Sequence, residues 1–188
     1  ECVAELGRRI AGSAGTLRVI LHSLAFAAFK PLVGAEDVAN RHQLELAIDV
    51  MGSSLVYWVQ ECLWAGVLDR GARVFAMTSL GGSRAWPQYG PVSAAKAVLE
   101  SHIRQLAVEL APAGITANAI LAGVTDTPAL RQIPGFEKIL ETARKKNPSR
   151  RLTQPEDVAR TIAALCHPAT YWLTGNVLHV DGGENIVG

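Results

Sequence analysis

The sequence contains no apolar run long enough to cross a membrane. Its longest run, from Leu55 to Leu68, is interrupted by Gln60 and Glu61 and falls short of the roughly 18 apolar residues that a spanning helix needs. The first residues also lack the basic leader and the apolar core of a signal peptide. We therefore expect a cytoplasmic protein that does not enter the membrane.

Cysteine, histidine and excess charge of one sign are equally scarce. The three cysteines form no CxxC pair and predict buried thiols rather than a disulfide framework or a zinc site. The five histidines show no HxxH-like spacing, so we expect no metal site. With 18 basic and 17 acidic side chains, the net charge of +1 provides no overall field for nucleic acid. The 188 residues, 49% of them hydrophobic, are most simply one globular domain with a substantial core.

Short apolar runs alternate with helical patterns along the chain. We predict strands at the start of 17–28 and at 73–78, 115–121 and 176–180, and helices at 3–11, 43–66, 91–110, 136–146 and 155–165. This alternation predicts an α/β fold with a parallel sheet covered on both faces. The run after Leu17 is typical of a strand buried on both faces, residues 69–71 of a turn, and residues 153–156 of a capping box that opens the last helix.

Tyr89 and Lys96 are the first candidates for chemistry. They lie seven residues apart, about 10.5 Å along a helix axis, and Tyr89 precedes Gly90-Pro91, so we expect it on the loop before the helix. A nearby ammonium would lower the phenol's pKa and make it a better proton donor. Spacing alone favours an ordinary tyrosine and a solvent-exposed lysine. The strand that ends at Ser79 and the motifs that follow favour a reactive pair.

Four segments from about Val19 to Gly188 resemble, in order, motifs of the short-chain dehydrogenase/reductase superfamily. They are LHSLAFA (21–27), TSLGGSRAWPQYGPVSAAKAVLE (78–100), ITANAILAGVTDTPAL (115–130) and TGNVLHVDGGENIVG (174–188). The Tyr89-x6-Lys96 spacing is similar to that of the enoyl-acyl-carrier-protein reductase branch, where the wider superfamily has Tyr-x3-Lys. The resemblance implies a Rossmann-like doubly wound parallel sheet.

Three departures from the superfamily pattern bear on the branch. Val92 stands four residues before Lys96, where the usual tyrosine would be, and Met51 stands in place of a helical asparagine. Both differences are expected of an enoyl reductase that uses Tyr89. Ser79 stands where the superfamily has a serine and many enoyl reductases have an aromatic residue. Because some enoyl reductases retain the serine, this narrows the possible subgroups of enoyl reductases without excluding the branch.

The resemblance implies hydride transfer from NADH or NADPH to the β-carbon of a trans-2-enoyl thioester in fatty acid synthesis. Negative charge then develops on the thioester oxygen, where the site must stabilise it. By resemblance, Tyr89 donates a hydrogen bond to that oxygen and Lys96 holds the ribose hydroxyls of the cofactor. Ser79 either hydrogen-bonds the substrate carbonyl or caps its own strand.

The resemblance also places the cofactor along the carboxyl edge of the sheet. Ala25 stands where glycine is commoner, Val124 would offer backbone groups to the carboxamide, and Thr127 is either a cofactor ligand or a cap before Pro128. The expected cofactor-binding residues are His22, Ser23, Leu24, Ala25, Lys96, Gly123, Val124 and Thr127.

Residues 128–151 resemble the mobile substrate lid. Its basic side chains would suit an acidic acyl carrier protein, although a solvated helix face explains them without a partner. A coenzyme A thioester is the other expected substrate form. The helices at about 43–66 and 92–110 correspond to those that build tetramers in the family, so we expect a homotetramer.

No glycine-rich phosphate-binding turn precedes these motifs. We therefore expect residues 1–188 to be a single but incomplete domain whose N-terminal strands are missing. Two alternatives stay open: another member of the superfamily that acts on ketones or alcohols, and a catalytically inactive truncated paralogue. The preference for NAD or NADP, the acyl-chain length and the carrier are left undecided.

Overall fold

The structure is a computed structural model that describes residues 2–12 and 15–187. In this part of the chain, four parallel strands form one sheet in the order β1-β2-β3-β4. The strands are β1 (Leu17–His22), β2 (Leu68–Thr78), β3 (Thr116–Ala122) and β4 (Val177–Val180). The helices are α1 (Cys2–Gly12), α2 (Arg41–Ile48), α3 (Ser54–Trp64), α4 (Gly90–Leu110), α5 (Phe136–Lys146) and α6 (Pro155–Leu165). The predicted parallel α/β fold is confirmed.

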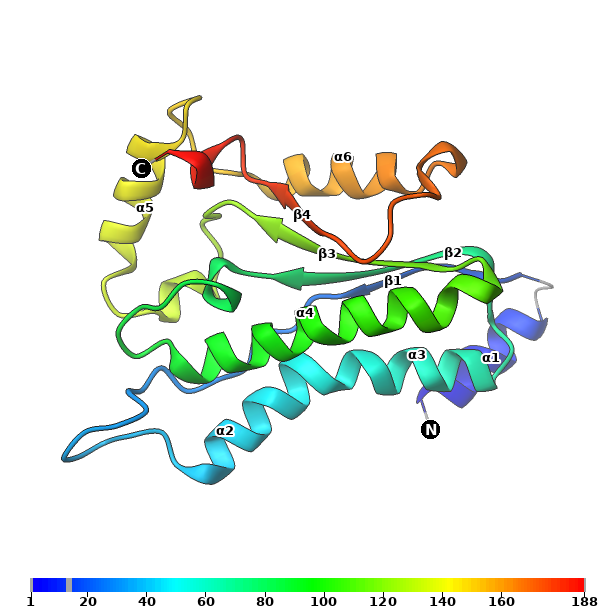
Figure 1. The fold of residues 1–188 in the computed structure, drawn as a ribbon, viewed down its shortest axis with the longest axis horizontal. Helices are drawn as coiled ribbons and strands as arrows, with labels where there is room; N and C mark the ends of the chain where they lie inside the picture. The colour runs from blue at the N-terminus through cyan, green and yellow to red at the C-terminus, as the bar shows by residue number, and fades with distance from the viewer. Residues whose placement is uncertain (1, 13–14, 188) are drawn as a thin grey trace.

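Helices cover the two faces of the sheet, with α3 and α4 on one side and α6 on the other (Figure 1). The buried positions of α4 recur at helical spacing, and Leu99 and Ile103 pack in one cluster with Ala117 and Ala119 of β3. These small alanines let the helix lie close to the sheet. The first turns of α4 lie at the edge where the strands end (Figure 1).

The structure corrects the expectation that the first strand is buried on both faces. In β1, Val19 packs in the cluster that includes Val158 of α6, but Leu21 on the same face is 47% exposed. Among the described residues β1 pairs with β2 alone, and residues 23–28 leave the sheet. An apolar run indicates that a strand favours burial, but whether each face of the strand is covered depends on the elements that pack next to it.

Two predicted boundaries also differ from the structure. The single helix expected at 43–66 is divided by a π-helical turn, η1 (Asp49–Ser53). Residues 69–71 belong to β2 instead of preceding it. They form an irregularity where the register with β1 shifts, with Gly71 at φ 84°.

The capping box of α6 lies one residue later than predicted. Gln154 is the N-cap, and its backbone N–H donates to the Asp157 carboxylate at 2.9 Å. The same carboxylate accepts two bonds from Arg151, while Thr153, the predicted cap, is buried. Asp157 rather than Glu156 takes the role because it is the N3 residue of a helix whose N-cap is Gln154. None of the described helices is long and apolar enough to span a membrane.

Candidate active site

The carboxyl edge of the sheet brings the predicted site residues together. His22 ends β1, Ser79 follows β2 and Gly123 follows β3, while Tyr89 and Lys96 come from the start of α4. In Figure 1 the strand arrows point toward this edge, where α4 begins and α5 lies. Ligands of open parallel sheets bind at this edge.

The Tyr89 ring is held by three neighbours. Tyr89 is the N-cap of α4, as expected from the Gly90-Pro91 sequence that follows it. Its ring stacks on Phe29 with centroids 5.9 Å apart, and meets Trp86 edge-on at 5.8 Å. It also lies so close to Gly81 that a Cβ there would sit 2.5 Å from Tyr89 Cε1. The position of the phenol is therefore set by packing.

The protonation of Tyr89 differs from the expectation. Burial raises the pKa of Tyr89 above its ordinary value, and a hydrogen bond with Ser79 opposes this shift. The prediction of a lowered pKa is wrong, because desolvation of the phenol is the largest effect on it and raises its pKa. A neutral phenol at physiological pH remains a hydrogen-bond donor.

Lys96 is buried beneath the ends of the first two strands. Its Nζ donates to the carbonyl of Met77 at 2.7 Å and to the carbonyl of Leu24 at 3.3 Å. Burial lowers the pKa of Lys96 to about 8, against the opposing charge of Glu100. An ammonium has three N–H donors, so two hold the backbone and one remains for a ligand.

Ser79 combines one of its expected roles with a contact to Tyr89. Its Oγ accepts from the backbone N–H of Gly81 at 3.2 Å and so caps the short turn η2 (Leu80–Gly82). Ser79 also acts on the phenol, because it lowers the pKa of Tyr89 against the effect of burial. Contact between Ser79 and a substrate carbonyl stays a prediction.

His22 is buried and forms a hydrogen-bonded link between β1 and α3. The Ser54 hydroxyl donates to the Val50 carbonyl at 2.7 Å and lies 2.8 Å from His22 Nε2. Nε2 is therefore the protonated nitrogen, and Nδ1 has no hydrogen-bond partner among the described residues. Burial, together with the charge of Lys96, lowers the pKa of His22 to about 4, so the ring is neutral. Next to it, Ser23, Leu24 and Ala25 are exposed on the loop.

The loop after β3 holds the remaining predicted residues. Gly123 N–H donates to the Val180 carbonyl at 3.1 Å, and Val124 N–H donates to Glu184 Oε2 at 3.1 Å. Thr127 Oγ1 accepts from Leu130 N–H at 3.2 Å, which agrees with a local capping role, while its role as a cofactor ligand stays a prediction. Of the Val124 backbone groups expected to bind the carboxamide, the N–H thus already has a protein acceptor.

Comparison with known proteins connects this geometry to a family. The sequence model described as enoyl-(acyl carrier protein) reductase matches residues 1–185. The chain belongs to this reductase family. Its match covers both the Tyr89–Lys96 pair and the loop after β3, and it confirms the branch expected from the Tyr-x6-Lys spacing.

Individual relatives agree with the family assignment. The chain is 32% identical over 188 residues to the enoyl-[acyl-carrier-protein] reductase [NADH] FabI of Aquifex aeolicus, covering all of this chain and 69% of that protein. It is 34% identical over 167 residues to the FabI of Escherichia coli, covering 88% of this chain and 63% of that protein. The chain thus spans about two thirds of the length of these relatives.

Solved structures of the family have the same fold. A crystal structure of the Aquifex aeolicus reductase superposes with a TM-score of 0.87 at 31% identity, covering 99% of this chain and 72% of that one. The Bacillus cereus reductase with NADP+ and indole naphthyridinone gives a TM-score of 0.88 at 31% identity, with the same coverage. The Rossmann-like fold implied by the resemblance is confirmed.

Two acidic residues of this reductase were missed by the sequence analysis. Glu100 Oε1 accepts from the Thr78 hydroxyl at 2.6 Å, directly before the Ser79 turn. Its position four residues after Lys96 on the same helix was an available signal. Glu184, the acceptor for Val124, follows the VDGG motif, but no local pattern connects it to a residue 60 positions earlier.

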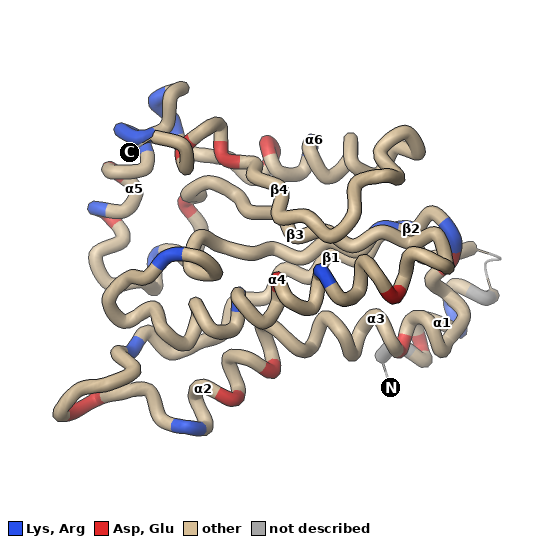
Figure 2. Tube along the Cα trace, in the orientation of Figure 1, with Lys and Arg blue, Asp and Glu red and all other residues tan. Residues whose placement is uncertain are grey.

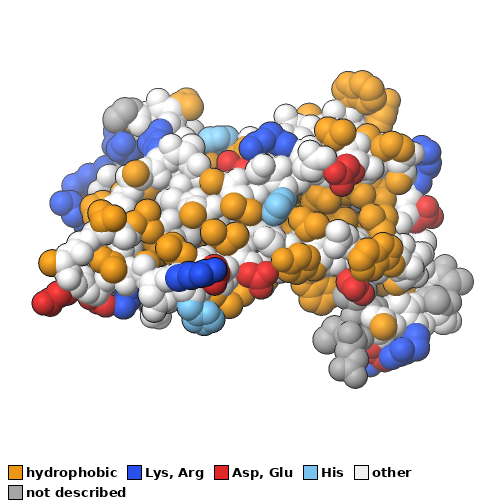
Figure 3. All heavy atoms as spheres, turned by 60° about the horizontal axis from the view of Figure 1, so that its bottom comes forward, with side chains coloured by type: hydrophobic (Ala, Val, Ile, Leu, Met, Phe, Trp, Pro, Cys, Tyr) orange, Lys and Arg blue, Asp and Glu red, His pale blue; other side chains and the backbone are white. Residues whose placement is uncertain are grey.

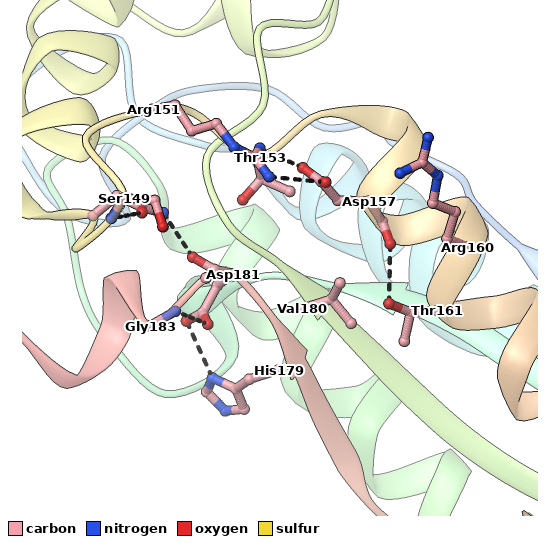
Figure 4. A pocket seen from close by; sticks show the side chains of 12 residues that line it. Ser149, Arg151, Thr153, Asp157, Arg160, Thr161, His179, Val180, Asp181 and Gly183 are labelled. Atoms are coloured by element: carbon pink, nitrogen blue, oxygen red, sulfur yellow. Dashed lines mark hydrogen bonds and ion pairs between the residues drawn. The ribbon is translucent and has the colours of Figure 1, made fainter.

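Two hollows lie near the reductase site. One of about 460 Å³ is next to Tyr89, and is lined by Pro31, Leu32, Val33, Ala85, Trp86, Gln88, Gly90, Ser93 and Ala94. The other, of about 410 Å³, lies between β4 and α6, where Arg151 pairs with Asp157 (Figure 4). None of the predicted catalytic residues Tyr89, Lys96 and Ser79 lines either hollow, but the first is lined by Gln88 and Gly90, the two neighbours of Tyr89 in the chain. In the described ranges, no cluster of three histidine, cysteine or acidic residues could hold a metal ion.

Proposed function

We propose that this chain carries the catalytic residues of an NAD(P)H-dependent enoyl-thioester reductase of fatty acid synthesis. The observation that carries the proposal is the placement of Tyr89 and Lys96 at the carboxyl edge of the sheet, with the family's spacing. The residues present fit a nicotinamide cofactor: within residues 2–12 and 15–187, Lys96 has one N–H that no hydrogen bond uses, and the buried Nδ1 of His22 has no partner. When bound, the cofactor supplies the hydride.

The protein's own contribution is electrostatic and positional. As hydride reaches the β-carbon, negative charge develops on the thioester oxygen, and Tyr89 donates a hydrogen bond to it. A donor fixed in advance by Phe29, Trp86 and Gly81 needs no reorganisation when the charge appears. Lys96 holds the ribose hydroxyls and keeps the local potential positive, and the largely apolar hollow of Leu32 and Trp86 suits an acyl chain.

Ketone reduction is the alternative activity within the same superfamily. The position that carries the superfamily's acid is Val92, which is buried against Met51 and Ala95. An alkyl side chain cannot donate a proton, and the thioether of Met51 cannot join a proton relay. These two residues favour conjugate reduction over ketone reduction.

For the partner, we propose an acyl carrier protein or coenzyme A thioester that approaches the lid, residues 128–151. Lys and Arg gather on α5 and on the loop after it (Figure 2). Lys145 pairs with Glu141 and Arg151 with Asp157. The exposed Arg144 is therefore the better candidate to meet an acidic carrier.

We further propose that copies of the chain assemble as a homotetramer in the cytoplasm. One face of the molecule exposes a broad apolar area (Figure 3). On α3, Tyr57, Trp58 and Trp64 are exposed, and on α4 Val108 is exposed. Contiguous apolar patches of this kind mark protein–protein interfaces.

The test is consumption of reduced cofactor by the full-length protein, with a trans-2-enoyl thioester and a 3-ketoacyl thioester compared under identical conditions. We expect turnover of the enoyl substrate alone. Tyr89→Phe should lower kcat by about 10²- to 10³-fold, as for loss of one oxyanion donor. Tyr171→Phe is the matched control, because it removes the hydroxyl of an exposed tyrosine that is not among the predicted site residues. Preference for the ketone, or full activity of Tyr89→Phe, would overturn the proposal.

A further inference from the structure

The turn after β4 contains a buried carboxylate that the proposed mechanism does not use. Glu184 opens the short turn η6 (Glu184–Ile186) and is only 7% exposed. Its Oε2 accepts the Val124 N–H at 3.1 Å. The Gly123 N–H, one residue earlier, donates to the Val180 carbonyl at the end of β4. Two successive amides of the loop after β3 are therefore bound, one to the end of β4 and the other to the turn that follows it.

The segment that contains this turn also binds the C-terminal part of the lid, residues 128–151. Asn147, the C-cap of α5, is 3% exposed, and its Nδ2 donates to the Asp181 carbonyl at 2.9 Å. The Asp181 carboxylate accepts from the backbone N–H groups of Gly183 and Asn185 and so holds the turn itself. Figure 4 shows Asp181 bonded to Gly183 beside Ser149. The loop that precedes the lid, through Val124, and the C-terminal part of the lid, through Asn147, thus both bind residues 181–184.

The charges of Asp181 and Lys146 act on Glu184 in opposite directions. Burial raises the pKa of Glu184, the Val124 N–H opposes the shift, the charge of Asp181 adds to it, and the charge of Lys146 opposes it. A carboxyl group accepts a hydrogen bond from an amide in either protonation state. The bond to Val124 therefore does not require the charge of Glu184, only an acceptor oxygen at that place.

We propose that Glu184 is a positioning residue. By binding Val124, it fixes the position of the cofactor loop, residues 123–127, relative to Asn147 in the C-terminal part of the lid. The inference rests on the proposed function for its catalytic meaning. Glu184 does not contact the substrate or the cofactor in this proposal, and it affects the reaction only through the position of Val124 and its neighbours. Its contribution is to keep the loop ordered before the cofactor arrives, which lowers the entropic cost of binding.

A matched pair of variants separates the acceptor from the charge. Glu184→Gln keeps the length of the side chain and an acceptor oxygen, whereas Glu184→Met keeps the length without an acceptor. Ile186→Ala, at an 87% exposed position of the same turn, is the control. Measurements on the full-length protein are NAD(P)H affinity by fluorescence, KM and kcat with an enoyl thioester, and hydrogen exchange of the Val124 amide.

We expect Glu184→Met to weaken cofactor affinity about tenfold, as for loss of one buried hydrogen bond, with a smaller change in kcat. Glu184→Gln should stay within about threefold of the wild type, and Val124 protection should fall only in Glu184→Met. Equal loss in both variants, or none in either, overturns the inference. If the wild type binds no nicotinamide cofactor, the proposed function fails instead, and the exchange of Val124 alone decides whether Glu184 orders the loop.

Discussion

Gly81→Ala tests whether the position of Tyr89 limits the reaction. The added Cβ would lie 2.5 Å from Cε1 and 2.9 Å from Cδ1 of the Tyr89 ring, whereas carbon atoms in contact prefer about 3.5–4.0 Å. The ring must therefore move by about 1 Å. It cannot do so freely, because Phe29 and Trp86 contact it from other sides. A displacement of about 1 Å at a reacting group costs about 10²-fold in rate.

We expect Gly81→Ala to lower kcat for the enoyl thioester about 100-fold. Its free energy of unfolding should fall by only about 1–3 kcal/mol, the usual cost of overpacking. Steady-state kinetics and urea denaturation measure the two effects. Gly12→Ala is the control, because a Cβ there meets nothing within 4 Å. A kcat for Gly81→Ala equal to that of the wild type would refute the argument that packing positions the phenol.

Two further predictions concern the lowered pKa values of the buried Lys96 and His22. Because burial lowers the pKa of Lys96 to about 8, we expect kcat/KM to fall with a one-proton slope above that pH. Lys96→Arg, which stays charged, should lack this limb, and a flat wild-type profile would contradict the assignment. The folded-state pKa of His22 is lowered from 6.5 to about 4, so its stabilising effect is complete above pH 6.5 and is lost as the pH falls toward 4. Urea denaturation of His22→Gln should lose this slope; an unchanged slope would place its origin in other groups.

Much of the fold and half of the site follow from local patterns. The helical spacing of Leu99 and Ile103, together with Pro91 in the first turn, predicts α4 and places Tyr89 before it and Lys96 within it. The apolar runs predict the strands, because burial in a parallel sheet selects β-branched and other apolar residues. The order of the motifs indicates the superfamily, and the Tyr-x6-Lys spacing indicates the enoyl reductase branch. Each of these signals lies within a short segment.

The remaining features depend on contacts between distant segments. Val124 meets Glu184 across 60 positions and His22 meets Ser54 across 32, and no periodicity connects such residues. The pKa of Tyr89 shifts upward because burial, which only packing creates, outweighs the opposing effect of Ser79. The sequence by itself therefore determined which residues could react and which elements carry them. The tertiary structure alone decided which of them are desolvated, what holds them in place, and which acidic side chains support the site.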